Sequence, residues 1–193
     1  MSTDQRPLRA DARRNRDRLV AAAREAFAVH GVEAPLDDIA RQAGVGPGTL
    51  YRHFPTRPDL LAAVYRDDVE TLTERARTAT ADLPPQEAVA VWLRLVLEHA
   101  KQKQGLGAAL KTMLAGDAET FTYCRTVLRG GLDETLSAAR EAGVLRPDAT
   151  TDDILRLVHG LGTALASTPQ DADRLLGFVL DGLRPQVAPT TPA

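Results

Sequence analysis

LDDIARQAGVGPGTLYRHF, residues 36–54, predicts two short helices joined by a tight turn. Ile39 lies on the apolar face of the first helix, and Gly44 supplies a turn residue that tolerates a positive φ. Leu50 and Phe54 anchor the second helix. This is the helix-turn-helix pattern, in which the second helix can lie in the major groove of DNA.

The second helix of the motif, from about Pro47 to Phe54, carries different chemistry on its two sides. Its outward positions hold side chains that can donate to base edges or to phosphates. We predict DNA contacts from Thr49, Tyr51, Arg52 and His53, with Arg57 at the start of the next helix placed for a phosphate. The alternative for Tyr51 and His53 is packing against a neighbouring helix.

Signals on both sides of the motif predict the helices that brace it. Asp11 can cap a helix that follows a flexible start and ends near residue 30, where Gly31 stops it. Thr56 and Asp59 form a variant of the capping box and open a long helix. The motif is therefore expected to lie between two longer helices.

The charge of the chain is unevenly distributed. The net charge is -2, but residues 1–57 hold ten arginines against seven acidic residues, whereas residues 58–193 are net acidic. Six arginines fall within the first eighteen residues: Arg6, Arg9, Arg13, Arg14, Arg16 and Arg18. They could neutralise phosphates or enter a minor groove, and the alternative is a solvated arginine-rich tail. Beside a helix-turn-helix the first interpretation is favoured, and we predict DNA contacts from Arg13 and Arg14.

Several classes of protein find little support in the composition. The chain of 193 residues is long enough for one or two domains, and its single cysteine excludes an intramolecular disulfide framework. No apolar run reaches membrane-spanning length and the N-terminus lacks the apolar region of a signal peptide, so we expect a cytoplasmic protein with no membrane partner. The four histidines are scattered without metal-ligand spacing, so we expect no metal, no cofactor and no enzymatic activity.

Residues Asn15 to Tyr65, above all IARQAGVGPGTLYRHFPTRPDLL, resemble the DNA-binding domain of TetR-family transcriptional regulators. The resemblance covers about the first third of the chain. It implies an all-α fold of about nine helices, with an N-terminal three-helix helix-turn-helix domain and a C-terminal helical domain for ligand binding and dimerisation. Two departures remove usual polar contacts: Pro35 replaces a capping Thr or Ser, and Gly46 replaces the usual Ser of the turn.

The regulatory domain is expected to begin after the helix-turn-helix. We predict a DNA-binding domain with a basic arm over residues 1–57, a regulatory and dimerisation domain over 58–185, and a disordered tail over 186–193. Helices are predicted at about 85–104 and 117–143, with a short helix around Met113 between them. Gly130 and Gly131 within the second of these predict a kink or a close helix contact.

A small-molecule pocket between these helices would be mostly apolar with few polar groups, as ligand sites usually are. The candidate pocket residues are Trp92, Val96, His99, Met113, Phe121, Cys124, Leu128 and His159. The alternative is that each of them is an ordinary core residue. Cys124 and His99 could form a nucleophilic pair only if the fold brought them together, and a structural cysteine is favoured.

The last two helices, residues 152–167 and a final one that ends at Pro185, predict a dimer surface. They combine large apolar residues with small ones that allow close helix approach. The candidate interface residues are Leu155, Val158, Gly162, Leu165, Leu176, Phe178, Val179 and Leu183. In the TetR family, two such helices from each subunit form a four-helix interface.

The sequence thus predicts a ligand-responsive transcriptional regulator. We expect a repressor that binds a palindromic double-stranded DNA operator as a homodimer and is released by a small-molecule effector. Two alternatives remain open: a nonspecific or architectural nucleic-acid binder, and a helical small-molecule carrier or enzyme.

Overall fold

The computed structural model describes residues 5–102, 112–114, 117–165 and 169–185, and within these ranges the chain is helical without β-strands. The described residues form eight α-helices, close to the predicted nine, and one short 3₁₀ helix. The α-helices are α1 (Gln5–His30), α2 (Leu36–Gln42), α3 (Pro47–His53), α4 (Arg57–Thr80), α5 (Pro85–Gln102), α7 (Ala118–Glu141), α8 (Thr151–Ala164) and α9 (Ala172–Gly182). The predicted all-α class is confirmed.

The chain divides into two compact units. The N-terminal unit comprises residues 1–68 and 105–122, and the C-terminal unit comprises residues 69–104 and 123–193. Since α4 contributes to both units, the domain boundary expected after residue 57 stays a prediction. Among the described residues, no helix is both long and apolar enough to cross a membrane.

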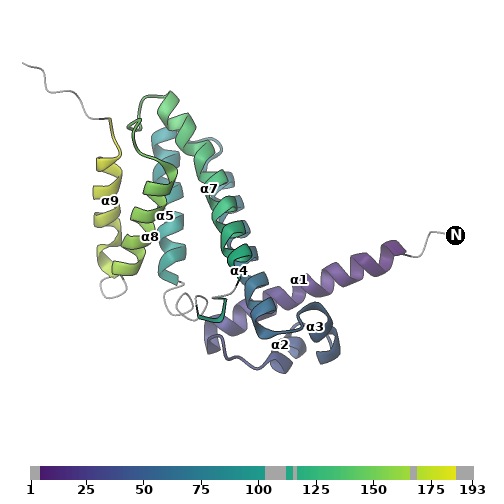
Figure 1. The fold of residues 1–193 in the computed structure, drawn as a ribbon. Helices are drawn as coiled ribbons and strands as arrows, with labels where there is room; N and C mark the ends of the chain where they lie inside the picture. Colours follow the sequence, from purple (N-terminus) through teal and green to yellow (C-terminus); the bar gives the residue numbers. More distant parts are fainter. Residues whose placement is uncertain (1–4, 103–111, 115–116, 166–168, 186–193) are drawn as a thin grey trace, which may run out of the picture. The chain divides into compact units, whose positions relative to one another are not determined.

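The N-terminal unit is built around one apolar cluster, which the C-terminal half of α1 shares with α2, α3 and the start of α4 (Figure 1). Leu19, Ile39, Leu50 and Leu60 in this cluster are each at most 1% exposed. Helix α1 begins at Gln5, so the flexible start that the sequence suggested is wrong from residue 5 onward, and so is the cap at Asp11; residues 1–4 lie outside the described residues. Asp11 instead lies within the helix and forms an exposed ion pair with Arg14, one turn later.

The start of α7 also belongs to the N-terminal unit. The Asp117 side chain accepts the backbone N–H of Thr120 at 2.9 Å and so caps the helix. Hydrogen bonds from the Thr120 hydroxyl and backbone lower the pKa of Asp117, so the cap stabilises the folded state until the pH falls through that lowered pKa. Arg66 of α4 donates to the Thr120 hydroxyl at 2.7 and 3.0 Å. These contacts attach the first turn of α7 to α4.

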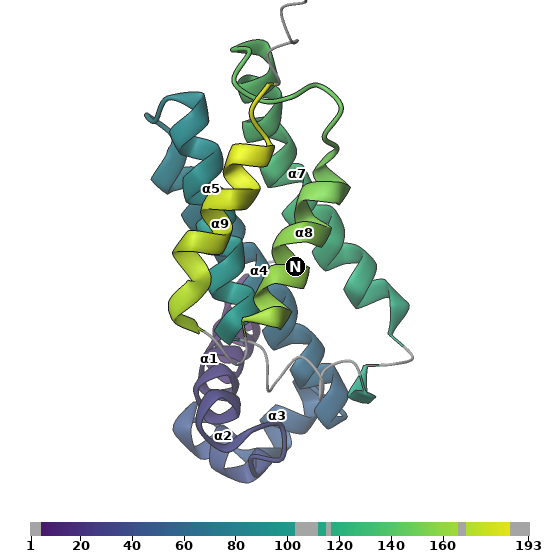
Figure 2. The same cartoon turned by 90° about the vertical axis from the view of Figure 1, so that its left-hand side faces the viewer.

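In the C-terminal unit, α5 packs against α8 and α9, as Figure 2 shows. Trp92 of α5 is fully buried in the apolar cluster of this unit. A Cβ atom placed on Gly131 of α7 would lie 2.6 Å from Thr73 Cγ2 and 3.0 Å from Trp92 Cζ2. The close helix contact predicted at the glycine pair is therefore present at Gly131, whereas Gly130 faces open space.

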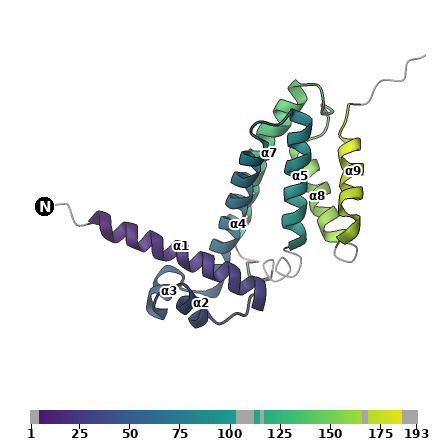
Figure 3. The same cartoon turned by 180° about the vertical axis from the view of Figure 1, so that it is seen from behind.

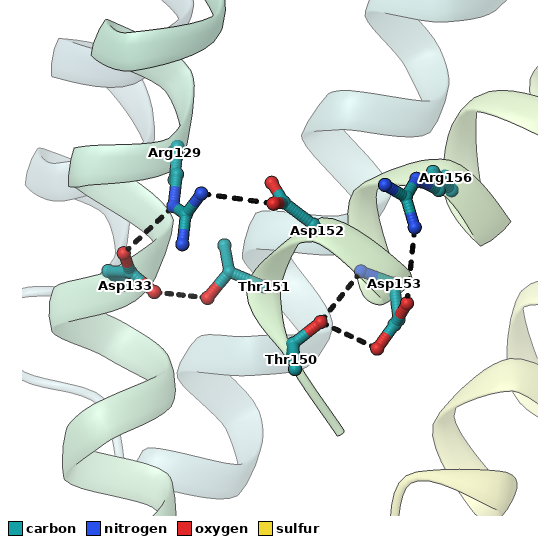
Figure 4. A network of polar contacts seen from close by, with 7 residues as sticks. All are labelled: Arg129, Asp133, Thr150, Thr151, Asp152, Asp153 and Arg156. Atoms are coloured by element: carbon teal, nitrogen blue, oxygen red, sulfur yellow. Dashed lines mark hydrogen bonds and ion pairs between the residues drawn. The ribbon is translucent and has the colours of Figure 1, made fainter. Parts of the chain in front are cut away.

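A polar network joins α7 to the start of α8 (Figure 4). Arg129 bridges Asp133, one turn away on α7, and Asp152 on α8. The Thr151 hydroxyl donates to Asp133, and the Thr150 hydroxyl accepts the backbone N–H of Asp153 at 3.2 Å. Thr150 thus caps α8, and this cap forms part of a larger set of contacts that positions the helix.

Candidate nucleic-acid interface

The turn between α2 and α3 has the geometry that its glycine predicts. Gly44 adopts φ 66°, and the N–H of Val45 donates to the carbonyl of Ala40 at 3.0 Å. Arg18 of α1 donates to the Gly44 carbonyl at 3.4 Å, and a Cβ atom on Gly44 would lie 2.3 Å from the Arg18 side chain. The positive φ favours glycine here, whereas the flexible end of the Arg18 side chain could shift to make room for a Cβ atom.

Helix α3 is fixed to the unit by its two predicted anchors, Leu50 (1% exposed) and Phe54 (4% exposed). Arg16 of α1 places its guanidinium over the Phe54 ring, 5.7 Å from the ring centroid. Pro47 is at the first position of the helix, and the preceding Gly46 offers no side-chain cap. Helix α3 is thus held in place by its buried side chains and by the contact of Arg16 with Phe54.

The outer side of α3 presents the polar residues that the sequence singled out. Arg52 is exposed and Tyr51 is 48% exposed. Thr49 and His53 are half-buried, and the His53 ring lies against the Phe54 ring with centroids 6.3 Å apart. Tyr51 and Arg52 are therefore the side chains of α3 best placed to reach another molecule, while His53 also serves packing.

Arg57 has a structural function that the sequence did not reveal. Its guanidinium donates to the backbone carbonyls of Val32 at 2.6 Å and Ala34 at 2.7 Å. Both carbonyls lie in the connection between α1 and α2, far from Arg57 in the sequence, so no local pattern could indicate the contact. The expected phosphate contact of Arg57 competes with this function.

We expect Arg57→Ala to lower the free energy of unfolding by about 1–3 kcal/mol, because two part-buried carbonyls lose a charged donor. Arg52→Ala is the matched control, since the exposed Arg52 should change stability by less than about 0.5 kcal/mol. Urea unfolding followed by circular dichroism measures both values. An Arg57→Ala protein as stable as the wild type, with weaker DNA binding, would favour the phosphate function instead.

The predicted basic arm is helical. Arg13 and Arg14 lie on the exposed N-terminal part of α1, which extends past α2 and α3 (Figure 3). The two arginines therefore lie on α1 itself, the same helix whose C-terminal half packs against the helix-turn-helix. The structure brings them into the same unit as Tyr51 and Arg52.

The predicted pocket residues divide between the two units. Met113 and Phe121 pack against the apolar cluster of the N-terminal unit, where the Phe121 ring lies 5.9 Å from that of Tyr65. The C-terminal unit holds the other candidates, which are Trp92, Val96, His99, Cys124, Leu128 and His159. Of these, Trp92, Val96 and Cys124 are buried, His99 and Leu128 are half-buried, and His159 is exposed. The Nε1–H of Trp92 is buried and has no hydrogen-bond acceptor among the described residues.

Most of the predicted dimer residues face the interior of the protomer. Val158, Gly162, Leu165, Leu176 and Leu183 are buried, and a Cβ atom on Gly162 would lie 2.7 Å from that of Ala100 on α5. These five residues are therefore not available to a second copy of the chain. Leu155 and Val179 are half-buried, and Phe178 is exposed.

The exposed apolar residues of α8 and α9 include Phe178 from the predicted set and Leu157, which the prediction omitted. Leu157 is 54% exposed and Phe178 is 62% exposed. Gly160 and Ala164 follow Leu157 at helical spacing and are exposed as well. The spacing of Leu157, Gly160 and Ala164 is visible in the sequence. Because both faces of α8 carry apolar residues, however, periodicity alone does not distinguish the inner face from the outer one.

Models of known protein families match sequence in both units. Residues 19–64 match the family model of bacterial regulatory proteins of the tetR family, and residues 84–185 match the C-terminal domain of SbtR-like transcriptional regulators. The chain belongs to the TetR family. The TetR resemblance of the N-terminal sequence thus extends through most of the chain.

Two crystal structures of TetR-family proteins are similar over nearly the whole chain. The TetR transcriptional regulator SCO0520 from Streptomyces coelicolor is 38% identical, with a TM-score of 0.72, over 89% of this chain and 99% of that one. A TetR transcription regulatory protein from Mycobacterium vanbaalenii is 35% identical, with a TM-score of 0.67, over 92% and 99%. A helix-turn-helix transcriptional regulator of Staphylococcus aureus is 41% identical over 64 residues, which span 33% of this chain and 35% of that protein.

Proposed function

We propose that this TetR-family protein is a repressor that binds a palindromic operator as a homodimer and is released by a small molecule. The observation that carries the proposal is the presentation of Tyr51 and Arg52 on the outer side of α3, while Leu50 and Phe54 hold its inner side in the core. A recognition helix needs this combination of a fixed backbone and outward donors to read base edges. Transcriptional regulation through DNA binding is the common function of the family.

The exposed apolar residues of α8 and α9 support the homodimer. An exposed Leu157 beside the small residues Gly160 and Ala164 suits close approach of a second helix, and Phe178 offers a large apolar side chain on α9. Binding of a palindromic operator requires that the two recognition helices of such a dimer reach successive major-groove faces, about 34 Å apart. This surface replaces the buried residues that the sequence suggested.

The C-terminal unit is the proposed site of the effector. Its apolar core surrounds Trp92, whose buried Nε1–H lacks an acceptor among the described residues. A buried donor without an acceptor is costly, so an effector that offers an acceptor to this N–H would gain free energy on binding. Release from DNA then requires that the effector bind more tightly to the conformation that does not fit the operator.

Selection of duplexes from a random-sequence pool by the full-length protein, followed by anisotropy measurements with random competitor DNA, tests the proposal. We expect a palindromic consensus that binds at least about 10³-fold more tightly than random DNA. Equal affinity for selected and random duplexes would instead support a nonspecific or architectural binder. Turnover of a compound bound in the C-terminal unit would support the carrier or enzyme alternative.

Substitutions on the outer side of α3 should weaken specific binding without changing the fold. We expect Arg52→Ala and Tyr51→Ala each to reduce affinity for the selected duplex by about 1–3 kcal/mol, or roughly 5- to 150-fold. Arg41→Ala, an exposed arginine of α2 that pairs with Asp38, is the matched control. Unchanged operator affinity in both α3 variants would show that another surface reads the DNA.

A further inference from the structure

The positive charge of the N-terminal unit is concentrated at one end of α1. Residues 19–57, which contain the helix-turn-helix, carry four arginines and four acidic residues and are therefore neutral. Residues 1–18 carry six arginines and three acidic residues. The whole surplus of positive charge in residues 1–57 thus lies before the first residues that pack into the core.

The arginines of the neutral part are largely engaged within the unit. Arg24 pairs with Asp67 and Asp68 of α4, Arg41 pairs with Asp38, and Arg57 donates to two backbone carbonyls. These side chains would have to give up existing contacts to bind phosphates. The helix-turn-helix by itself therefore offers little positive charge to the DNA backbone.

The start of α1 packs little, although Arg14 pairs with Asp11, Arg16 stacks on Phe54 and Arg18 donates to Gly44. Among the side chains that the structure describes, the first buried one along α1 is Leu19, and the residues from Asp11 to Arg18 are exposed except for the half-buried Asn15. At 1.5 Å per residue, the helix from Gln5 to Arg18 extends about 20 Å. That length corresponds to about six base pairs of a duplex at 3.4 Å each.

Two contacts fix the direction of this helix relative to α3. Arg16 stacks over Phe54, the residue that follows α3, and Arg18 donates to Gly44 in the turn that precedes α3. The helix and the recognition helix are therefore parts of one unit, and a duplex bound along α3 meets a helix of fixed direction. Figure 3 shows this part of α1 reaching past α3.

We propose that the N-terminal part of α1, before Leu19, is a second DNA-binding element in which the exposed Arg13 and Arg14 hold backbone phosphates beyond those reached by α3. The occupant is duplex DNA because the element combines surplus positive charge with two contacts that tie it to the two ends of the recognition helix. Its contacts are to phosphates and carry no base sequence, so they supply the affinity and salt dependence that the neutral helix-turn-helix lacks. The proposal rests on operator binding by this chain and specifies how that binding is achieved.

The test compares the salt dependence of binding by the full-length chain and its variants. Arg13→Gln combined with Arg14→Gln removes two exposed charges per protomer without touching the core. We expect the slope of log K against log salt to become shallower by about two to four for a dimer, with affinity about 10- to 100-fold lower near 0.1 M salt. Arg13→Lys combined with Arg14→Lys keeps the charges and should retain the wild-type slope.

Arg75→Gln combined with Arg125→Gln is the matched control, because both arginines are exposed in the C-terminal unit and the change in net charge is the same. The slope of log K against log salt for this control should equal that of the wild type. Phosphate ethylation interference should in addition reveal contacts up to about six base pairs from those of α3, and the Gln variant should lose them. A wild-type slope in the Gln variant would overturn the proposal.

The same measurements separate this proposal from the operator proposal. If the wild type fails to prefer a selected duplex over random DNA, specific operator binding fails, while the slopes on random DNA still test the α1 element. If selectivity is present but the Gln variant has an unchanged slope and interference pattern, operator binding stands and the α1 element fails.

Discussion

Leu157→Glu combined with Phe178→Glu should convert the proposed dimer into a monomer and reduce affinity for the proposed operator by about 10²- to 10⁴-fold, the range in which linking two binding modules improves affinity. Both side chains are more than half exposed in the protomer. Their replacement therefore leaves the protomer core intact, whereas four glutamates brought together at a two-fold interface repel each other and lose apolar contact. Sedimentation equilibrium measures the mass, and anisotropy with the selected duplex measures the affinity.

His159→Glu is the control for this experiment. His159 is exposed on α8 and lies about 200° around the helix from Leu157, so a glutamate there adds charge without entering the proposed interface. The control should remain a dimer with wild-type affinity. A double variant that still sediments as a dimer would show that α8 and α9 pair through other residues or not at all.

Trp92→Ala should lower the free energy of unfolding by about 3–5 kcal/mol, the cost of removing a fully buried aromatic side chain. Trp92 is 0% exposed. A Cβ atom on Gly131 would lie only 3.0 Å from Cζ2 of the indole, so a larger residue at position 131 would press against the ring. The surrounding helices are therefore shaped around this ring and cannot close the cavity completely. At about 2–4 °C per kcal/mol for a chain of this size, the melting temperature should fall by roughly 6–20 °C.

Tyr51→Ala provides the comparison for Trp92→Ala, because it also removes an aromatic side chain but from a site that is 48% exposed. We expect its effect on stability to stay within about 0.5 kcal/mol. Thermal unfolding followed by circular dichroism at 222 nm measures both proteins. Equal losses of stability would contradict the interpretation of Trp92 as a central core residue.

The parts of the fold that the sequence predicted well depend on short-range chemistry. Gly44 at φ 66°, Pro47 at the first position of α3 and the Thr56–Asp59 box each act within a few residues, so the pattern alone specifies the geometry. The same holds for the cap of α8 by Thr150. The helix-turn-helix and the TetR family were accessible from sequence for this reason.

The parts that the sequence could not predict depend on long-range packing. The carbonyl partners of Arg57 lie 23 and 25 residues away, and no local signal marks them. On α8 and α9 both faces are apolar, so Val158 and Leu176 were assigned to an interface although they belong to the core. The arginine-rich start has the charge of a flexible arm, but Arg and Ala also favour a helix, and from residue 5 onward the chain is helical.

The burial of Trp92 gives this protein an internal optical probe. It is the single tryptophan of the chain, and it lies in the C-terminal unit, whereas Tyr51 and Tyr65 lie in the N-terminal unit. Emission excited near 295 nm therefore comes from the core of the C-terminal unit alone and shifts to longer wavelength when water reaches the indole. Small-molecule libraries can be screened by this signal without a label, and a compound that perturbs it changes the surroundings of Trp92 in the C-terminal unit.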